Sequence, residues 1–171
     1  RLLADVRLDP ARRSARTLAP AISELLDRTG ARPGDVRLVA KTVGPGSFTG
    51  LRIGVTTAKT FAYAVGAQVL GLSTLEVIAA GVPRGLVGNS REVQAVLDAQ
   101  RGELFVGRFR VSPSLDADLL PLVERLAHDR LMTAESWRCE LRTDAIAVGS
   151  GLRRLRRPPR RHGPRGFRRS V

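Results

Sequence analysis

Small and hydroxyl-bearing residues gather in one short segment, between positions 44 and 50. The segment reads Gly-Pro-Gly-Ser-Phe-Thr-Gly and follows an apolar, β-branched run over residues 36–43. A strand cannot continue through Gly-Pro-Gly, so the segment predicts a tight turn that leads into a helix. Backbone amides at the start of a helix can bind anions such as phosphate. The candidate phosphate-binding residues are Gly44, Gly46, Ser47 and Thr49.

Three motifs for related chemistry do not fit this segment. A Walker A loop requires lysine and then serine or threonine after its last glycine, whereas Gly50 is followed by leucine and arginine. The dinucleotide motif requires glycines spaced as Gly-x-Gly-x-x-Gly, and here the last interval is one residue too long. The serine nucleophile elbow requires glycines where Pro45 and Thr49 stand. We therefore predict no catalytic residue in this segment.

The helix predicted to follow, residues 48–65, carries a small residue at every fourth position. Gly50, Gly54, Ala58 and Ala62 form one ridge without side-chain bulk, and the apolar residues Phe48, Leu51, Val55 and Phe61 flank it. A glycine inside a helix costs about 1 kcal/mol relative to alanine, so we expect another backbone to lie close against the ridge. The segment is interpreted as an interface helix or a phosphate cradle, with a purely structural turn as the alternative.

One carboxylate outside this segment is singled out, Asp98, which ends a predicted strand at the turn Asp-Ala-Gln-Arg-Gly over residues 98–102. It is interpreted either as a ligand-facing carboxylate or as a group that stabilises the turn. The two histidines, His128 and His162, have no companion ligands, and the sequence has no His-x-x-x-His motif. We therefore expect no metal site and no metalloprotease activity.

The positive charge of the chain is concentrated near its end. The 29 basic and 16 acidic residues give a net charge of +13, yet residues 153–171 contribute nine arginines and no acid. This Arg/Pro/Gly-rich tail is expected to be disordered, and it is either native or the product of a shifted reading frame. Arginine-rich tails bind RNA phosphates, but this one lacks the interleaved aromatic residues of a base-stacking segment.

The remaining composition indicates a cytoplasmic protein that does not enter a membrane. The single cysteine, Cys139, cannot form an internal disulfide and fits a reducing compartment. No apolar run approaches the length of a membrane span. A charge interrupts the first apolar residues, so no signal peptide is expected.

Hydrophobic periodicity predicts helices and strands along most of the chain. Strands are expected at residues 2–8, 36–43, 67–72, 92–97, 103–111 and 144–148. Helices are expected at residues 17–29, 48–65, 74–80, 119–131 and 134–141, with loops at 81–90 and 112–118. Strands and helices alternate first and a hairpin follows, which indicates an α/β fold with a mixed sheet.

Residues 44–54, Gly-Pro-Gly-Ser-Phe-Thr-Gly-Leu-Arg-Ile-Gly, resemble the signature of the TsaB (YeaZ) family of bacterial tRNA threonylcarbamoyladenosine biosynthesis proteins. Three further stretches are similar to that family in the same order, namely residues 17–26, 69–75 and 98–105. Gln100 stands where the family usually has arginine. The resemblance covers roughly residues 2–151.

This resemblance implies an actin/hexokinase-like (ribonuclease H-like) α/β fold of the Gcp (M22-like) superfamily, with a mixed sheet and flanking helices. Residues 1–111 would form the N-terminal lobe and residues 112–152 the start of a second lobe. The family begins with a strand that carries an Asp-Thr-Ser-like phosphate turn. We expect this chain to lack that strand and the distal part of the second lobe.

The function implied by the resemblance is that of a non-catalytic partner subunit. Its complex would install threonylcarbamoyl on N6 of adenosine 37 in tRNA, with tRNA contacted indirectly, ATP used at the level of the complex and no cofactor of the subunit's own. The implied partners are a TsaD-type catalytic paralogue, a TsaE-type ATPase or a second copy, bound through helices 17–29 and 48–65. The implied partner-binding residues are Ile22, Leu25, Phe48, Gly50, Leu51, Gly54, Val55 and Ala58.

Two other functions stay open on the sequence. An ATP-binding or ATP-hydrolysing enzyme of the actin/sugar-kinase fold would use residues 44–49 as a phosphate cradle and Asp98 as its carboxylate. A simple RNA-binding module would depend on the arginine-rich tail.

Overall fold

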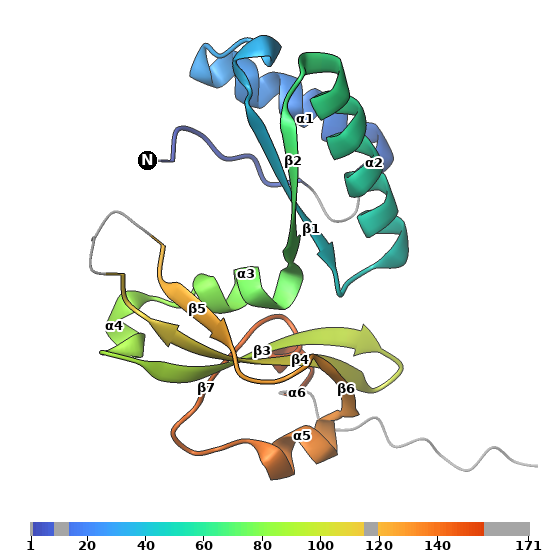
Figure 1. The fold of residues 1–171 in the computed structure, drawn as a ribbon. Helices are drawn as coiled ribbons and strands as arrows, with labels where there is room; N and C mark the ends of the chain where they lie inside the picture. The colour runs from blue at the N-terminus through green and yellow to red at the C-terminus, as the bar shows by residue number, and fades with distance from the viewer. Residues whose placement is uncertain (1, 9–13, 115–119, 156–171) are drawn as a thin grey trace, which may run out of the picture.

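The computed structural model describes residues 2–8, 14–114 and 120–155, and these residues form two β-sheets with a short helix, α3, between them (Figure 1). The helices are α1 (Ser14–Thr29), α2 (Phe48–Val65), α3 (Thr74–Ala80), α4 (Arg84–Val87), α5 (Ala134–Glu140) and α6 (Leu152–Leu155), with a 3-10 turn at Pro33–Asp35. The strands are β1 (Leu38–Gly44), β2 (Gln68–Ser73), β3 (Arg91–Gln100), β4 (Glu103–Ser112), β5 (Leu122–Arg125), β6 (Arg130–Thr133) and β7 (Ile146–Val148). None of the helices in the described ranges is both long enough and apolar enough to cross a bilayer.

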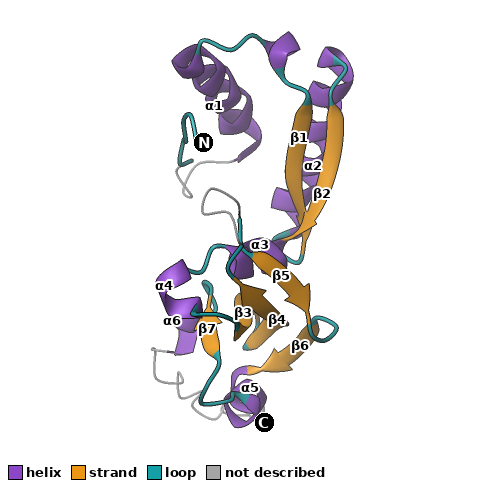
Figure 2. Cartoon of the chain, turned by 60° about the vertical axis from the view of Figure 1, so that its left-hand side comes forward, coloured by secondary structure: helices purple, strands orange, loops and turns teal. Residues whose placement is uncertain are grey.

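The first sheet consists of two parallel strands, β1 and β2, paired from Leu38 opposite Gln68 to Thr42 opposite Leu72. Parallel neighbours require a crossover connection, and α2 provides it. Figure 2 shows α2 behind the two strands, where it covers one face of the sheet, and α1 packs against α2. Among the residues that the structure describes, the helical layer of this sheet is thus α2 with α1 behind it.

The second sheet has the strand order β5-β4-β3-β7, with β6 also paired to β4. β3 and β4 form an antiparallel hairpin, and β7 runs parallel to β3. The lobe boundary expected at residue 111 therefore falls at the end of β4, inside this sheet, because β4 pairs with both β5 and β6.

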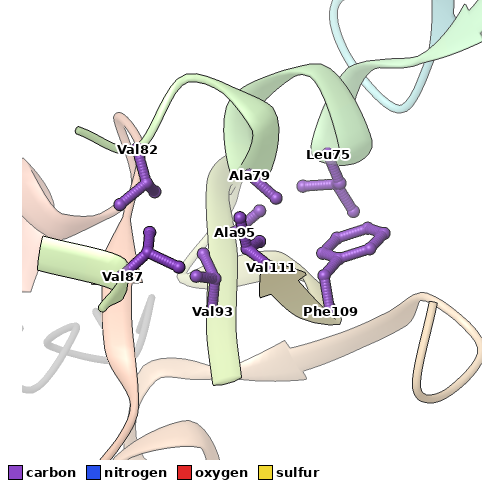
Figure 3. Packing of buried hydrophobic residues seen from close by; sticks show 8 residues of the cluster. All are labelled: Leu75, Ala79, Val82, Val87, Val93, Ala95, Phe109 and Val111. Atoms are coloured by element: carbon purple, nitrogen blue, oxygen red, sulfur yellow. The ribbon is translucent and has the colours of Figure 1, made fainter. Parts of the chain in front are cut away.

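The main core lies between α3 and the second sheet (Figure 3). Leu75 and Phe109 are fully buried there, next to smaller side chains from α3, α4, β3 and β4. The full set is Leu75, Ala79, Val82, Val87, Val93, Ala95, Phe109 and Val111. A second cluster on the other face of the sheet contains Val96, Leu104, Val106, Met132 and Trp137. α3 also contacts β1 and β2, so it joins the two sheets.

Most predicted elements are confirmed, including three helix starts. The hydroxyls of Ser47, Ser73 and Thr133 accept hydrogen bonds from the backbone N–H three residues later, as N-cap residues do. α1 begins at Ser14, three residues before the predicted start, and contains Pro20 in its interior.

Three predicted elements are wrong. Residues 2–8 pair with no strand of the described part of the chain, and a strand needs such a neighbour. The predicted loop 81–90 contains the helical turn α4. The predicted helix 119–131 is replaced by β5 and β6, because the edge of β4 opposite β3 is available for antiparallel pairing. β6 pairs with the first half of that edge and β5 with the last. Residues 115–119 and residues 156–171, most of the predicted tail, lie outside the described ranges.

Candidate functional site

The turn between β1 and α2 has a backbone that the sequence Gly-Pro-Gly makes possible. Gly44 has φ +130°, a conformation that residues with a side chain rarely adopt, and the Gly44–Pro45 peptide is cis. The Leu51 side chain lies over the turn, so that a Cβ at Gly44 would be 3.5 Å from its Cδ1. Leu51 is therefore part of the turn's own packing.

The start of α2 is capped by Ser47. Its Oγ accepts a hydrogen bond from the Gly50 N–H at 3.4 Å, and its carbonyl accepts from the Leu51 N–H at 2.8 Å. The Ser47 hydroxyl, a predicted phosphate ligand, is thus already engaged in capping the helix. Thr49, the other predicted hydroxyl ligand, is exposed. Phosphate binding by this turn stays a prediction.

The ridge of small residues on α2 faces the interior of this chain. Gly54, Ala58 and Ala62 are buried. The neighbour of Gly54 is the Lys41 side chain of β1, since a Cβ built on Gly54 would overlap Lys41 Cε and lie 2.8 Å from its Nζ. The expectation of a close backbone is therefore wrong at Gly54, where a long side chain fills the space above the strand.

Lys41 is the residue of this site that sequence reasoning missed. Its ammonium donates a hydrogen bond to the Thr42 carbonyl at 2.5 Å and is half-buried between β1 and α2. Within the described ranges, no carboxylate lies at ion-pair distance from it. The signal was visible as the one charged residue in the apolar run over 38–43.

The residues predicted to bind a partner fall into three groups by exposure. Gly54 and Ala58 are buried. Phe48 is 78% exposed at the first position of α2. The half-buried group comprises Ile22, Leu25, Gly50, Leu51 and Val55. Since α1 packs against α2, the structure brings the two predicted interface helices together.

Asp98 lies apart from this turn in the fold, at the tip of the β3–β4 hairpin. Its Oδ1 accepts a hydrogen bond from the Gln100 N–H at 2.8 Å. Gln100 and Arg101 have φ angles of 66° and 48°, and the carboxylate supports this left-handed turn. A ligand-facing role for Asp98 stays a prediction.

The second sheet carries the clearest electrostatic feature, an ion pair between β3 and β4. Arg108 donates two hydrogen bonds to Glu92, at 2.9 and 3.1 Å, and these hold the pKa of Glu92 below its ordinary value. Beside it the buried Gln94 accepts a hydrogen bond from Trp137 Nε1 at 2.9 Å, which fastens α5 to the sheet. No group of three or more potential metal ligands occurs among the residues that the structure describes.

A family model described as tRNA N6-adenosine threonylcarbamoyltransferase, TsaD, matches residues 8–126. The tRNA threonylcarbamoyladenosine biosynthesis protein TsaB of Bacillus subtilis (strain 168) is 33% identical over 106 residues, which cover 60% of this chain and 43% of the relative. The TsaB protein of Escherichia coli (strain K12) is 33% identical over 99 residues, 58% of this chain and 42% of the relative. The match thus spans less than half the length of either relative.

Solved structures show the same likeness. YeaZ from Pseudomonas aeruginosa superposes with a TM-score of 0.63 and 26% identity, over 86% of this chain and 65% of that chain. A protein described as similar to peptidase YeaZ from the same organism gives a TM-score of 0.66 and 25% identity, over 86% and 66%. These matches confirm the predicted actin-like (ribonuclease H-like) α/β fold class.

Proposed function

The chain belongs to the TsaD-like tRNA N6-adenosine threonylcarbamoyltransferase family, in which its relatives are TsaB (YeaZ) proteins, and from this premise we propose that it is a non-catalytic partner subunit in tRNA threonylcarbamoyladenosine biosynthesis. The observation that carries the proposal is the match over residues 8–126, which includes α1, the Gly-Pro-Gly-Ser turn and α2. The product of the complex is threonylcarbamoyl on N6 of adenosine 37 in tRNA.

The proposed partner is a TsaD-type catalytic paralogue, with a TsaE-type ATPase in the same complex. A second copy of the chain is the alternative occupant of the same helices. The subunit works in the cytoplasm, reaches tRNA through the complex, and leaves ATP to its partners.

The proposed contact is the outer stripe of α2 together with α1. Residues 48, 52, 55, 59 and 63 recur at intervals of three and four, so they share one face of the helix, next to the buried ridge. Phe48 and Tyr63 on this stripe are 78% and 92% exposed. Large aromatic side chains of this kind supply much of the binding energy of interfaces, and the half-buried Val55 lies between them.

The test is complex formation with a TsaD-type subunit, measured by light scattering after size exclusion on the full chain. We expect the wild-type chain to form a 1:1 complex and Phe48→Asp to weaken it by about tenfold or more, the equivalent of 1.4 kcal/mol. Leu86→Asp is the matched control, because Leu86 is 55% exposed on α4, away from α1 and α2.

Two outcomes would contradict the proposal. A wild-type chain that stays monomeric beside a TsaD-type subunit, while a longer TsaB relative binds it, would remove the partner role. A complex that tolerates both Phe48→Asp and Tyr63→Asp would remove the outer stripe of α2 from the interface. Thermal unfolding of each variant separates loss of binding from loss of fold.

A further inference from the structure

The outer stripe of α2 carries two cations and no carboxylate. Arg52 and Lys59 are exposed, and neither forms an ion pair with another residue in the described ranges. The whole helix, residues 48–65, contains no aspartate or glutamate. Two like charges without counter-charges give this face of the helix a positive field.

The spacing of the two cations is that of charged positions in paired helices. They are seven residues apart, which is two turns of the helix and about 10 Å along its axis. Phe48 and Tyr63 lie at the two ends of the stripe and Val55 lies between the cations. Charges that flank apolar positions at this interval form ion pairs between helices and determine the choice and orientation of the partner helix.

The neighbouring helix α1 does not compensate this charge. It contains two arginines and two acids, so its formal charges cancel. Glu24 is moreover paired with Arg28 of the same helix at 2.6 Å. The net charge of the two predicted interface helices is therefore the +2 of Arg52 and Lys59. Cations that lose water in an interface need opposite charges from the partner.

The same two cations disfavour a second copy on this stripe. A contact between two copies is commonly twofold symmetric, so that the same patch of each copy faces the other. An antiparallel contact of two α2 helices centred on the stripe, between Val55 and Thr56, would bring Arg52 of each copy next to Lys59 of the other. Like charges brought together in an interface suppress binding.

We propose that the TsaD-type subunit docks on the outer stripe of α2 through a helix with two carboxylates about 10 Å apart, one for Arg52 and one for Lys59. Apolar side chains of that helix would cover Val55 and receive the rings of Phe48 and Tyr63. The charges select this acidic partner over a second copy of the chain. The inference rests on the proposed function and adds the chemistry of the partner's surface to it.

The first test is the salt dependence of association between the full chain and a purified TsaD-type subunit, measured by stopped-flow fluorescence. We expect the association rate of the wild type to fall about tenfold as the salt concentration rises from about 0.05 to 0.5 M, because salt screens the attraction between the two surfaces. In the double variant Arg52→Gln/Lys59→Gln the same change of salt should alter the rate by less than about threefold.

The second test reverses the charges one at a time. Arg52→Glu and Lys59→Glu should each weaken the complex about tenfold. Arg101→Glu is the matched control, because it changes the net charge equally at the exposed tip of the β3–β4 hairpin, and it should bind within about twofold of the wild type. Lysine is then placed at each acidic position of the partner's docking helix in turn. One such partner variant should bind Lys59→Glu more tightly than it binds the wild type, a rescue that a loss of fold cannot produce.

A third test needs no TsaD-type subunit. In the twofold contact, Lys59→Glu would turn both repulsive pairs into attractive ones, so this variant should self-associate more than the wild type in light scattering. The double variant Arg52→Glu/Lys59→Glu would restore repulsion, so it should self-associate no more than the wild type. If Lys59→Glu fails to raise self-association, the charges do not select against a second copy.

The remaining outcomes separate this inference from the proposed function. A complex that forms but tolerates both charge reversals and high salt would overturn the inference and leave the partner role standing. A wild-type chain that does not bind the TsaD-type subunit would overturn the partner role and the inference with it. Charge reversals that weaken binding of a tRNA transcript, but not of the subunit, would assign the stripe to RNA instead. Circular dichroism of each variant establishes that the fold is intact.

Discussion

The contact between Gly54 and Lys41 gives a quantitative prediction that only the structure could suggest. A Cβ at Gly54 would overlap the end of the Lys41 side chain, so Gly54→Ala forces that side chain to move. The same substitution gives α2 a better helix former. The stability of Gly54→Ala therefore depends on whether the displacement of Lys41 or the gain in helix propensity is larger. Lys41→Ala removes the displacement and leaves the gain in helix propensity.

The magnitudes follow from the two contacts. Replacing glycine by alanine inside a helix is worth about 1 kcal/mol. Displacing Lys41 from its hydrogen bond with the Thr42 carbonyl costs about 1–2 kcal/mol, since the group is charged and half-buried. In the wild-type background we therefore expect Gly54→Ala to be neutral or up to about 1 kcal/mol destabilising. In the Lys41→Ala background it should stabilise by about 1 kcal/mol, a coupling of about 1–2 kcal/mol.

The assay is urea unfolding of the wild type, the two single variants and the double variant, followed by circular dichroism. Gly50→Ala is the control, because a Cβ there meets only the Ser47 side chain at the ordinary distance of 3.6 Å. Its effect should be the same with and without Lys41, within about 0.5 kcal/mol. Additive effects of Gly54→Ala and Lys41→Ala would refute the reasoning, since they would mean that Lys41 does not occupy the space above Gly54.

Three further predictions concern the second sheet, each measured by urea unfolding. Phe109→Ala should cost about 3–5 kcal/mol, because the fully buried ring fills the core beneath α3. Gly149→Ala should cost at least about 2 kcal/mol, because Gly149 has φ +123° and a Cβ there would overlap the Val96 carbonyl; a neutral effect would contradict this packing. Glu92→Gln should cost about 1 kcal/mol at pH 7 by weakening the bond to Arg108. The Arg108 guanidinium lowers the pKa of Glu92 in the folded state, so this difference should hold above the ordinary pKa of about 4.3 and fade as the pH falls through the lowered value; a difference that grows in acid would contradict the assignment.

Features that depend on neighbours in the sequence were predictable. The caps at Ser47, Ser73 and Thr133 need only a hydroxyl at the right position before a helix, and each stands directly before a helix predicted to begin at residue 48, 74 or 134. The β3–β4 hairpin was likewise visible as two β-branched runs around a short turn.

Features that depend on distant partners were not predictable in the same way. The leucines between residues 119 and 131 have a spacing that also suits a helix, and the segment becomes β5 and β6 because β4 offers the edge that β3 does not occupy. Residues 2–8 have a strand-like pattern without a strand partner in the described ranges. The hydrophobic pattern of a segment indicates its own preference for helix or strand. Whether a strand actually forms depends on a neighbouring strand with which it can pair.

The ridge on α2 shows the same limit at a candidate site. A four-residue repeat of glycine and alanine indicates that a neighbouring group packs close to one face of a helix, but it does not identify that neighbour. An interface between subunits and the packing of a helix on its own strand both require that face, and only the register of β1 places Lys41 beneath Gly54. Because Gly54 belongs to the interior, Gly54→Leu would disturb the fold and any interface together. The partner proposal must therefore be tested at Phe48 and Tyr63, whose exposed rings can be changed without altering the packing beneath them.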